Sequence, residues 1–331
     1  MSELRKNIIS RQWVIIATER ARRPHQFTRE KKVRKELPRY VPNCPFCPGN
    51  EAQTPPERFR LSVAGNWRVR VVPNKFPALT EEDKLVSTNI GNKRTISGVG
   101  IHEIIIETPD HNGTLALMNN AEVERVIEAY LYRYHCTLAD SRVEYVTLFK
   151  NHGAAAGTSI EHPHSQIIAT PIIPGEIRER LESALQFYDE RGQCIFCVTL
   201  REEQEEHTRI VDENEQFVAF IPFAALSPFH LWIFPKRHCA AFGSINDAER
   251  IALASIMRRV LRKLYDGLGD PDYNFVIRTG PKDQRLRHYH WYVTIVPRVT
   301  QTAGFELGSG MSINMALPEE SAQFLRGVVV N

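Results

Sequence analysis

Three polar side chains alternate along one short stretch, His162-Pro163-His164-Ser165-Gln166. In an extended chain, residues two apart point to the same side, so both imidazoles and the Gln166 amide would share one face. An unperturbed imidazole has a pKa of about 6.5 and is largely neutral at pH 7, so His164 could attack an α-phosphorus and form a phosphoramidate. Gln166 could then donate a neutral hydrogen bond to the phosphoryl oxygens. The stretch therefore predicts a nucleophile, His164, and a supporting amide, Gln166.

A loop of small residues precedes this stretch and reads Asn151-His-Gly-Ala-Ala-Ala-Gly157-Thr-Ser159. Small side chains let a ligand approach the backbone closely, so the loop is a candidate phosphate cradle. It lacks the Gly-Lys-Ser/Thr ending of a P-loop, and its context carries the prediction. Two arginines near the amino end, Arg20 and Arg23, could supply the positive charge that phosphoryl transfer requires.

Cysteine pairs with a two-residue gap occur twice, and this gap lets both sulfurs reach one metal ion from a tight turn. Histidines recur at equivalent positions after each pair, with an offset of 127 residues between positions 111 and 238 and of 128 between positions 162 and 290. The repeat predicts two metal-ligand sets. The first is Cys44, Cys47, His111 and His162, and the second is Cys194, Cys197, His238 and His290.

Two thiolates and two imidazoles form a closed tetrahedral shell that suits Zn²⁺ and leaves no site for activated water, so both metals are predicted to be structural. A metal on His162 would also fix the strand that presents His164. In the second set, His288 is an alternative to His290, because residues two apart on a strand face the same way. Spacing alone leaves that choice open.

The order of predicted elements repeats as well. In each half, strand-like runs precede one amphipathic helix and two further strands follow it. The helices are expected over 121–139 and 247–264, with Asn120 and Asn246 at the N-cap positions. Strands before and after a single long helix, joined by short turns, indicate antiparallel pairing and an α+β class.

The length of 331 residues suits two domains of roughly 150 residues each. We expect the halves to span 1–175 and 176–331, with an amphipathic helix over 176–190 at their junction. Each half should be an antiparallel sheet with a long helix.

The charge balance and the apolar runs limit the classes of partner. A net charge of +3 is too balanced for a broad nucleic-acid footprint, and no apolar run approaches the ~20 residues of a membrane span. The polar amino end lacks the apolar core of a secretory signal, so a cytoplasmic location is expected, with the cysteines as thiols. We therefore expect small, locally held anions as ligands, with neither nucleic acid nor membrane as a partner.

Five motifs are spread over nearly the whole chain: Arg20-Ala-Arg-Arg-Pro24, Cys44-Pro-Phe-Cys-Pro-Gly-Asn50, Pro109-Asp-His111, Gly153-Ala-Ala-Ala-Gly157 and His162-Pro-His-Ser-Gln166. Their combination resembles the galactose-1-phosphate uridylyltransferase family of the histidine-triad superfamily. The resemblance implies two tandem histidine-triad-like halves. It also implies a homodimer in which each subunit completes its partner's active site, and Glu306 is the candidate for that role.

The same resemblance implies ping-pong nucleotidyl transfer. A nucleoside diphosphate sugar such as a UDP-hexose would give its nucleotidyl group to His164, and a phosphate-bearing acceptor such as a hexose 1-phosphate would collect it. The first metal set matches the family's zinc ligands. Gln166 and Ser159 match its phosphate ligands, and Asn151 and Gly157 fall in the same loop.

The sequence departs from the sugar-transferring members where substrates are held. Those enzymes usually have Asn-Asp-Phe where this chain has Asn74-Lys75-Phe76, and the acidic residue there holds the ribose. Asn74 stays a candidate substrate ligand, whereas Lys75 leaves the choice of base open. The stretch from Gly304 to Gly310 and the second cysteine pair look more like an adenylyl-transferring branch, exemplified by plant ADP-glucose phosphorylase, which favours His290 over His288.

Alternative activities follow from these departures. One is an adenylyltransferase or phosphorylase that passes AMP from ADP-glucose or adenylylsulfate to inorganic phosphate. Another is a nucleotide hydrolase, although histidine-triad hydrolases generally carry a third histidine where this chain has Gln166. A zinc-stabilised binding module without catalysis is the remaining alternative, and the second metal set could hold iron in place of zinc.

Overall fold

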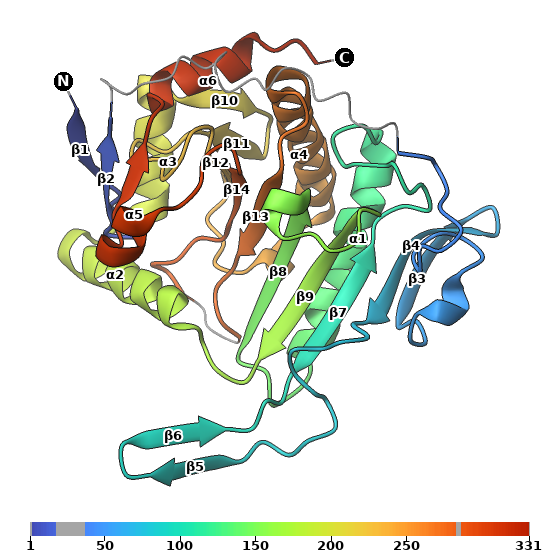
Figure 1. Cartoon of the computed structure of the whole chain (residues 1–331). Coiled ribbons are helices and arrows are strands. Elements are labelled where there is room, and N and C mark those ends of the chain that lie inside the picture. The colour runs from blue at the N-terminus through green and yellow to red at the C-terminus, as the bar shows by residue number, and fades with distance from the viewer. Residues whose placement is uncertain (1, 18–36, 283–285, 331) are drawn as a thin grey trace.

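The computed structural model describes residues 2–17, 37–282 and 286–330. Within these ranges, ten strands form one antiparallel sheet in the order β10-β11-β12-β14-β13-β8-β9-β7-β4-β3 (Figure 1). The amino-terminal half supplies β3 (Phe59–Val63), β4 (Asn66–Pro73), β7 (Ile101–Ile106), β8 (Tyr145–His152) and β9 (His164–Thr170). The carboxyl-terminal half supplies β10 (Ile210–Glu213), β11 (Phe217–Phe220), β12 (Leu231–Pro235), β13 (Tyr273–Arg278) and β14 (Tyr292–Pro297).

The two five-stranded sets are mirror copies in strand order, and they join where β8 pairs with β13. The α+β class with antiparallel strands is therefore confirmed, and the sheets of the two halves are continuous. The junction register pairs Asn151 with Asn274 and His152 with Tyr273. This junction places residues of the second half beside the loop that follows β8.

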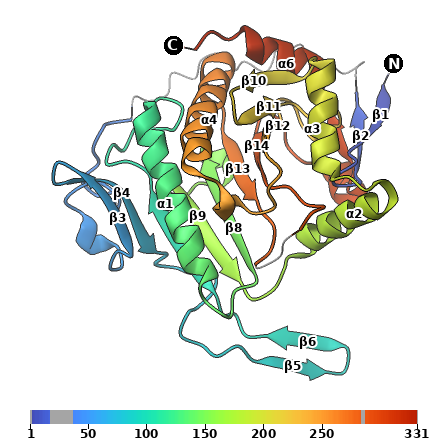
Figure 2. The ribbon, with the colours of Figure 1, turned by 180° about the vertical axis from the view of Figure 1, so that it is seen from behind.

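One long helix per half covers the same face of the sheet, and these two helices, α1 (Asn120–Leu138) and α4 (Asp247–Leu268), pack side by side (Figure 2). Their apolar stripes, with Val126 and Val260 fully buried, form the main core against the sheet. Asn246 caps α4 as predicted. The N-cap of α1 is Asn119 instead of Asn120, because Asn119 has the extended backbone from which its side chain can accept from the Glu122 N–H.

The junction helix is present as α2 (Gly175–Arg191), and a second helix, α3 (Ile195–Glu206), follows directly. Sequence patterning did not predict α3. The strands β9 and β14 begin at His164 and Tyr292, so the predicted metal ligands His162 and His290 lie in the turns before them. Short 3₁₀ turns complete the loops: η3 (Glu51–Gln53), η4 (Ala154–Ala156) and η5 (Phe242–Ser244).

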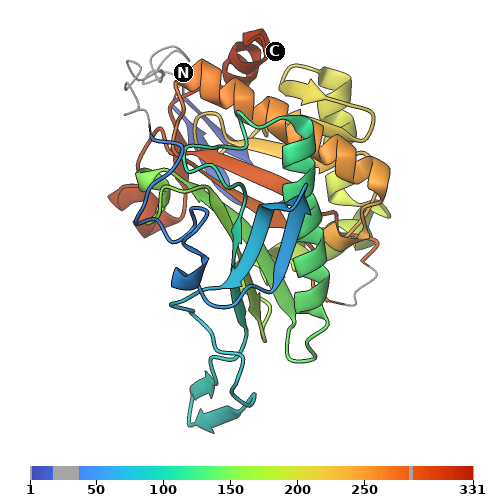
Figure 3. The same cartoon turned by 90° about the vertical axis from the view of Figure 1, so that its right-hand side faces the viewer.

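Smaller elements surround the sheet. The strands β1 (Glu3–Lys6), β2 (Trp13–Ile16) and β15 (Ser312–Asn314) form a small sheet, and β5 (Ser87–Ile90) and β6 (Lys93–Ile96) form a hairpin that projects from the body (Figure 3). Two further helices are α5 (Gly304–Ser309) and α6 (Pro318–Gly327). No helix in the described part of the chain combines the length and apolar character needed to cross a bilayer.

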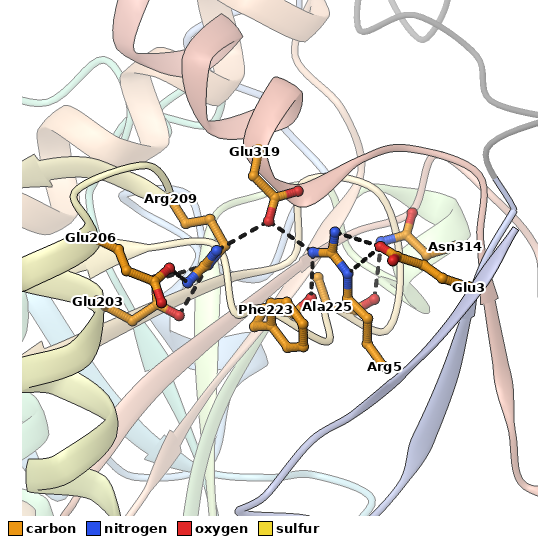
Figure 4. Close-up of polar contacts among 9 residues, drawn as sticks. All are labelled: Glu3, Arg5, Glu203, Glu206, Arg209, Phe223, Ala225, Asn314 and Glu319. Carbon is orange, nitrogen blue, oxygen red and sulfur yellow. Dashed lines mark hydrogen bonds and ion pairs between the residues drawn. The ribbon is translucent and has the colours of Figure 1, made fainter. Parts of the chain in front are cut away.

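An ionic network fastens the amino-terminal strands to the second half (Figure 4). Glu319 of α6 accepts from Arg5 of β1 at 2.8 Å and from Arg209 at 3.1 Å. Arg209 also pairs with Glu203 of α3 at 2.9 Å, and these two side chains are almost fully buried. Because breaking one partner of such a pair leaves an uncompensated buried charge, the network holds the segments in one arrangement.

Candidate active site and metal centres

His164 is the first residue of β9, and a hydrogen bond determines which of its ring nitrogens carries the proton. Its Nδ1 lies 2.8 Å from the carbonyl oxygen of His162. A carbonyl oxygen only accepts, so Nδ1 carries the proton and Nε2 keeps a lone pair. Burial lowers the pKa of His164, so the ring is neutral at pH 7. A neutral imidazole with an unprotonated Nε2 is the state that nucleophilic attack requires.

His164 lines a cavity of about 950 Å³. Its wall comes mainly from the loop after β8 and from the turn before β9, and the second half contributes Gly269, Asp270 and Asp272. Asn151 and Ser159, two of the predicted substrate ligands, line the same cavity. A space of this size suits a nucleotide-sized ligand.

A buried ionic cluster supports the strand from the helix side. The Lys150 Nζ lies 2.6 Å from a Glu107 carboxylate oxygen and donates to the His164 carbonyl oxygen at 3.2 Å. Tyr130 of α1 donates to Glu107 at 2.9 Å, and Ser165 also donates to it. Burial alone would raise the pKa of Glu107, but the attraction of Lys150 and these hydrogen bonds outweigh it and lower the pKa. The carboxylate is therefore ionised and fully paired.

Gln166 shares the His164 face of β9, since the two residues are two positions apart on one strand. Its Oε1 lies 2.8 Å from the His102 Nε2, and the His102 Nδ1 accepts from the Ala78 N–H at 3.0 Å. Asn74 reaches the same His102 Nε2 at 3.0 Å. The structure thus gathers both predicted ligands, Gln166 and Asn74, around His102, a residue that sequence reasoning did not single out.

The loop after β8 is built on two glycines with positive φ, Gly153 at +83° and Gly157 at +88°. At Gly153, a Cβ would lie 2.1 Å from Asp272 Oδ1, so a side chain is excluded by space as well as by conformation. The same Asp272 carboxylate accepts from the Ala155 N–H at 2.7 Å. The candidate phosphate loop of the first half is therefore held by the second half.

The first predicted metal set comes together, with the four ligand atoms within 4.8 Å of one another and all four residues buried. The Cys47 Sγ lies 3.5 Å from the His111 Nδ1 and 3.6 Å from the His162 Nδ1. A tetrahedral Zn²⁺ with ordinary bond lengths would place sulfur and nitrogen ligands about 3.5 Å apart. The donor set and its spacing therefore fit that ion.

The protonation of this cluster agrees with metal binding. Burial lowers the pKa of His162 to about 4 and also lowers the pKa of His111, so both rings are neutral ligands at pH 7. Burial raises the pKa of the Cys44 thiol to about 11, so a bound cation would have to compensate for the thiolate. The His162 Nε2 lies 2.8 Å from the Thr108 carbonyl oxygen, which leaves Nδ1 for the metal.

The second set is also assembled, again with ligand atoms within 4.8 Å. The Cys197 Sγ lies 3.2 Å from the His238 Nδ1 and 3.5 Å from the His290 Nδ1. The cluster contains His290, whereas His288 contributes only its backbone oxygen, 3.4 Å from the Cys194 Sγ. Each half therefore carries one Cys₂His₂ cluster directly before its last strand.

Three predicted substrate ligands stand apart from this arrangement. Arg20 and Arg23 lie outside the described residues. Glu306 lies on α5, where its carboxylate accepts from the Ala303 N–H at 3.0 Å, and it is not among the described residues that line the His164 cavity. Sequence reasoning also missed Asp272 and Lys150; the only signal was their position at the ends of predicted strands.

Comparison with known proteins decides the family. The chain matches the model of the galactose-1-phosphate uridyl transferase N-terminal domain over residues 1–174 and that of the C-terminal domain over residues 180–326. The chain belongs to this family. It is accordingly a nucleotidyltransferase.

Two curated relatives cover nearly the whole chain. The chain is 36% identical over 333 residues to ADP-glucose phosphorylase of Arabidopsis thaliana, covering 98% of this chain and 93% of that protein. It is 28% identical over 337 residues to galactose-1-phosphate uridylyltransferase of Thermotoga maritima, covering 98% of each.

Solved structures agree with these relatives. The fold matches an ADP-glucose phosphorylase from Arabidopsis thaliana with bound ADP-glucose, at a TM-score of 0.84 and 32% identity over all of both chains. A uridylyltransferase structure matches at a TM-score of 0.76 and 25% identity, covering 98% of this chain and 97% of that one.

Proposed function

We propose that this nucleotidyltransferase moves an adenylyl group from ADP-glucose to inorganic phosphate through a covalent intermediate on His164. The observation that carries the proposal is the fixed tautomer of His164, a cavity-lining residue whose Nδ1–H is bound to the His162 carbonyl. An unprotonated Nε2 next to a loop of small residues suits attack on a bound α-phosphate.

Two displacements make up the proposed reaction. In the first, the His164 Nε2 bonds to the α-phosphorus, the bond from that phosphorus to the bridging oxygen breaks, and glucose 1-phosphate leaves with the electron pair. In the second, a phosphate oxygen attacks the same phosphorus, the P–N bond breaks, and ADP forms as His164 returns to its neutral state. The Nδ1–H stays on the His162 carbonyl in both steps and stabilises the charged ring of the intermediate.

The choice of donor rests on the relatives and on one substitution. The adenylyl donor is favoured by the 36% identity to an ADP-glucose phosphorylase over nearly the whole chain. Lys75, in place of the family's ribose-holding aspartate, points the same way. A second candidate is uridylyl transfer from a UDP-hexose to a hexose 1-phosphate, favoured by the full-length match to the uridylyltransferase of Thermotoga maritima.

A donor panel tests both candidates. ADP-glucose, UDP-glucose and adenylylsulfate, each labelled in the α-phosphate, are incubated with the wild-type protein, and acid-labile label on the protein is counted. We expect label from ADP-glucose first, its loss in His164→Asn, and its retention in a matched exposed-histidine control, His135→Asn. Label that phosphate releases as ADP supports the phosphorylase. Release only by hexose 1-phosphate supports the uridylyltransferase, and free nucleotide without acceptor supports a hydrolase.

We assign Zn²⁺ to both Cys₂His₂ clusters as a structural ion, because the closed donor sets fit it in number and spacing. In the first cluster, the ligands would hold the His162 backbone, and through it the His164 tautomer. Elemental analysis of purified protein should give two zinc ions per chain; iron in the second cluster would revise this assignment for that site.

We also propose a homodimer in which Glu306 reaches the partner's cavity, since Glu306 does not line the described cavity of its own chain. Mixing His164→Asn with Glu306→Ala protein should then restore activity above that of either variant. Sedimentation as a monomer at assay concentration would contradict the dimer.

A further inference from the structure

A row of polar side chains crosses the junction of the two halves and ends at the nucleophile. The register pairs Asn274 of β13 with Asn151 of β8, and continuing the pairing of Phe149 with Gln166 places Asn151 opposite His164 of β9. Residues directly opposite in antiparallel strands share a face. Arg298 follows β14, the next strand outward, so the row runs over four adjacent strands (Figure 1).

The orientation of the Asn274 amide is fixed from both ends. The Arg298 Nε lies 2.5 Å from the Asn274 Oδ1, and a guanidinium has only donors, so that oxygen must be the acceptor. The Asn274 Nδ2 lies 2.8 Å from the backbone oxygen of Ala156, which can only accept. Both contacts demand the same orientation of the Asn274 amide.

This orientation determines that of the next amide. The Asn274 Nδ2 also lies 2.8 Å from the Asn151 Oδ1, so it donates and the Asn151 oxygen accepts. The Asn151 Nδ2 is therefore the group that remains to face the loop, and it lies 3.9 Å from the position that a Cβ on Gly157 would occupy. Asn151 lines the cavity beside His164.

We propose that Asn274, with Arg298 behind it, is a positioning residue that turns the Asn151 N–H toward the phosphoryl group at His164. The inference rests on the proposed nucleotidyl transfer, and it adds that the carboxyl-terminal half sets the polarity of the phosphate site. If Asn151 were free to rotate, its amide oxygen could face the negative phosphoryl oxygens half of the time. The chain of hydrogen bonds from Arg298 through Asn274 to Asn151, here called the relay, excludes this unfavourable orientation of Asn151 before substrate binds.

The sharpest variant is Asn274→Asp. Its carboxylate can still accept from Arg298, but it has no donor, so the Asn151 amide must turn its own N–H back and present oxygen to the phosphate. Because losing one preorganised donor costs about 10²-fold or more, we expect kcat/KM to fall about 100-fold, mainly in kcat. Arg298→Ala should cost only a few-fold, because Ala156 still orients Asn274. Asn92→Asp, in the β5–β6 turn, adds the same charge as a control.

A double-mutant cycle separates positioning from structural damage. If Asn274 acts through Asn151, the Asn274→Asp change should alter kcat/KM by less than about 3-fold in an Asn151→Ala background. Melting temperature and metal content should match the wild type. Equal losses in both backgrounds, or no loss in either, would overturn the relay.

Binding gives a readout independent of turnover. Calorimetry should show that Asn274→Asp weakens ADP about 10-fold and leaves adenosine, which lacks phosphate, unchanged. If the wild type binds ADP but no donor labels it, the proposed function fails, while the same cycle measured on ADP affinity still tests the role of Asn274. If the wild type labels and the cycle is additive, only the relay fails, and absence of nucleotide binding would overturn both.

Discussion

The two halves share a scaffold but differ at the residue that opens the last strand of each. In both, a histidine of the Cys₂His₂ cluster stands two residues before that position, which is His164 in one half and Tyr292 in the other. Tyr292 is 1% exposed, its hydroxyl accepts from Arg180 at 3.0 Å, and its ring packs 5.0 Å from that of Phe234. Where the first half has a cavity, the second has a packed aromatic cluster.

The comparison separates framework from chemistry. Cys₂His₂ clusters that could hold a metal ion occur in both halves, and so does a histidine bonded across to the last strand of the large sheet: His102 reaches Gln166 at 2.8 Å, and His230 reaches Thr294 at 2.7 Å. These repeated features belong to the fold. The cavity at His164, the small-residue loop and the His164 tautomer have no counterpart at the buried Tyr292, so they mark the chemistry.

The largest expected difference is between the two strand-opening residues. His164→Asn should lower nucleotidyl transfer about 10⁴-fold or more, because the nucleophile is lost. Tyr292→Phe should stay within about 3-fold and lower only the melting temperature, since it removes a hydroxyl from a packed cluster. Labelling with α-phosphate-labelled donor measures both. A large activity loss in Tyr292→Phe would mean that the aromatic cluster around Tyr292 takes part in the reaction.

The next largest effect concerns the buried pair behind His164. Lys150→Met leaves Glu107 buried without its cation, which should cost about 3–5 kcal/mol of unfolding free energy. At the equivalent position of β13, opposite the residue that follows Tyr292, the chain has Ile277, which is buried in the apolar core and forms no ion pair. Urea unfolding of Lys150→Met, with the hairpin variant Lys93→Met as control, measures the difference.

The same pair predicts a change in pH dependence. In the wild type the folded pKa of Glu107 is lowered, so its stabilisation is present above the ordinary pKa of 4.5 and is lost as pH falls below it. Without Lys150, burial raises that pKa, so stability should fall as pH rises from 4.5 toward 7. Between pH 4.5 and 7 the unfolding free energy of the variant should therefore fall, while that of the wild type stays nearly level with respect to this group and drops only below 4.5. Parallel curves would show that Lys150 does not hold the charge.

Removing a metal ligand from each cluster should have a smaller effect on activity, and the effect should differ between the two clusters. Cys44→Ser and Cys194→Ser should each remove one metal ion per chain by elemental analysis and lower the melting temperature. Only Cys44→Ser should also lower transfer, by about 10–100-fold, because its cluster holds the backbone that fixes His164. Equal activity losses in the two variants would make both clusters general supports of the fold.

The smallest expected effect is the loss of a helix N-cap, and we expect the same stability cost in both halves. Asn119 and Asn246 cap the equivalent helices α1 and α4, each in a reciprocal box with a glutamate three residues on. Replacing either with alanine should cost about 1 kcal/mol of stability and leave transfer unchanged. Thermal unfolding of both variants checks this, and a marked inequality would show that the halves unfold independently.

Much of the site follows from local pattern. The metal sets could be predicted because cysteine pairs sit in tight turns and the whole arrangement repeats, and His164 could be predicted from strand alternation. The support of the loop by Asp272 and Asn274 could not, because it depends on the pairing of β8 with β13, which no periodicity records. Helix α3 was not predicted because it begins between the two cysteines of the second pair, a spacing that also indicates a tight metal-binding turn.

The pairing of β8 with β13 also limits how the molecule can be divided. A fragment ending near residue 175 would leave β8 as an exposed edge with unpaired backbone donors and acceptors, a form that readily recruits other chains. It would lose the Asp272 contact to the loop as well. Neither half expressed alone should therefore be an active enzyme, whereas two co-expressed fragments could associate through the pairing of β8 with β13.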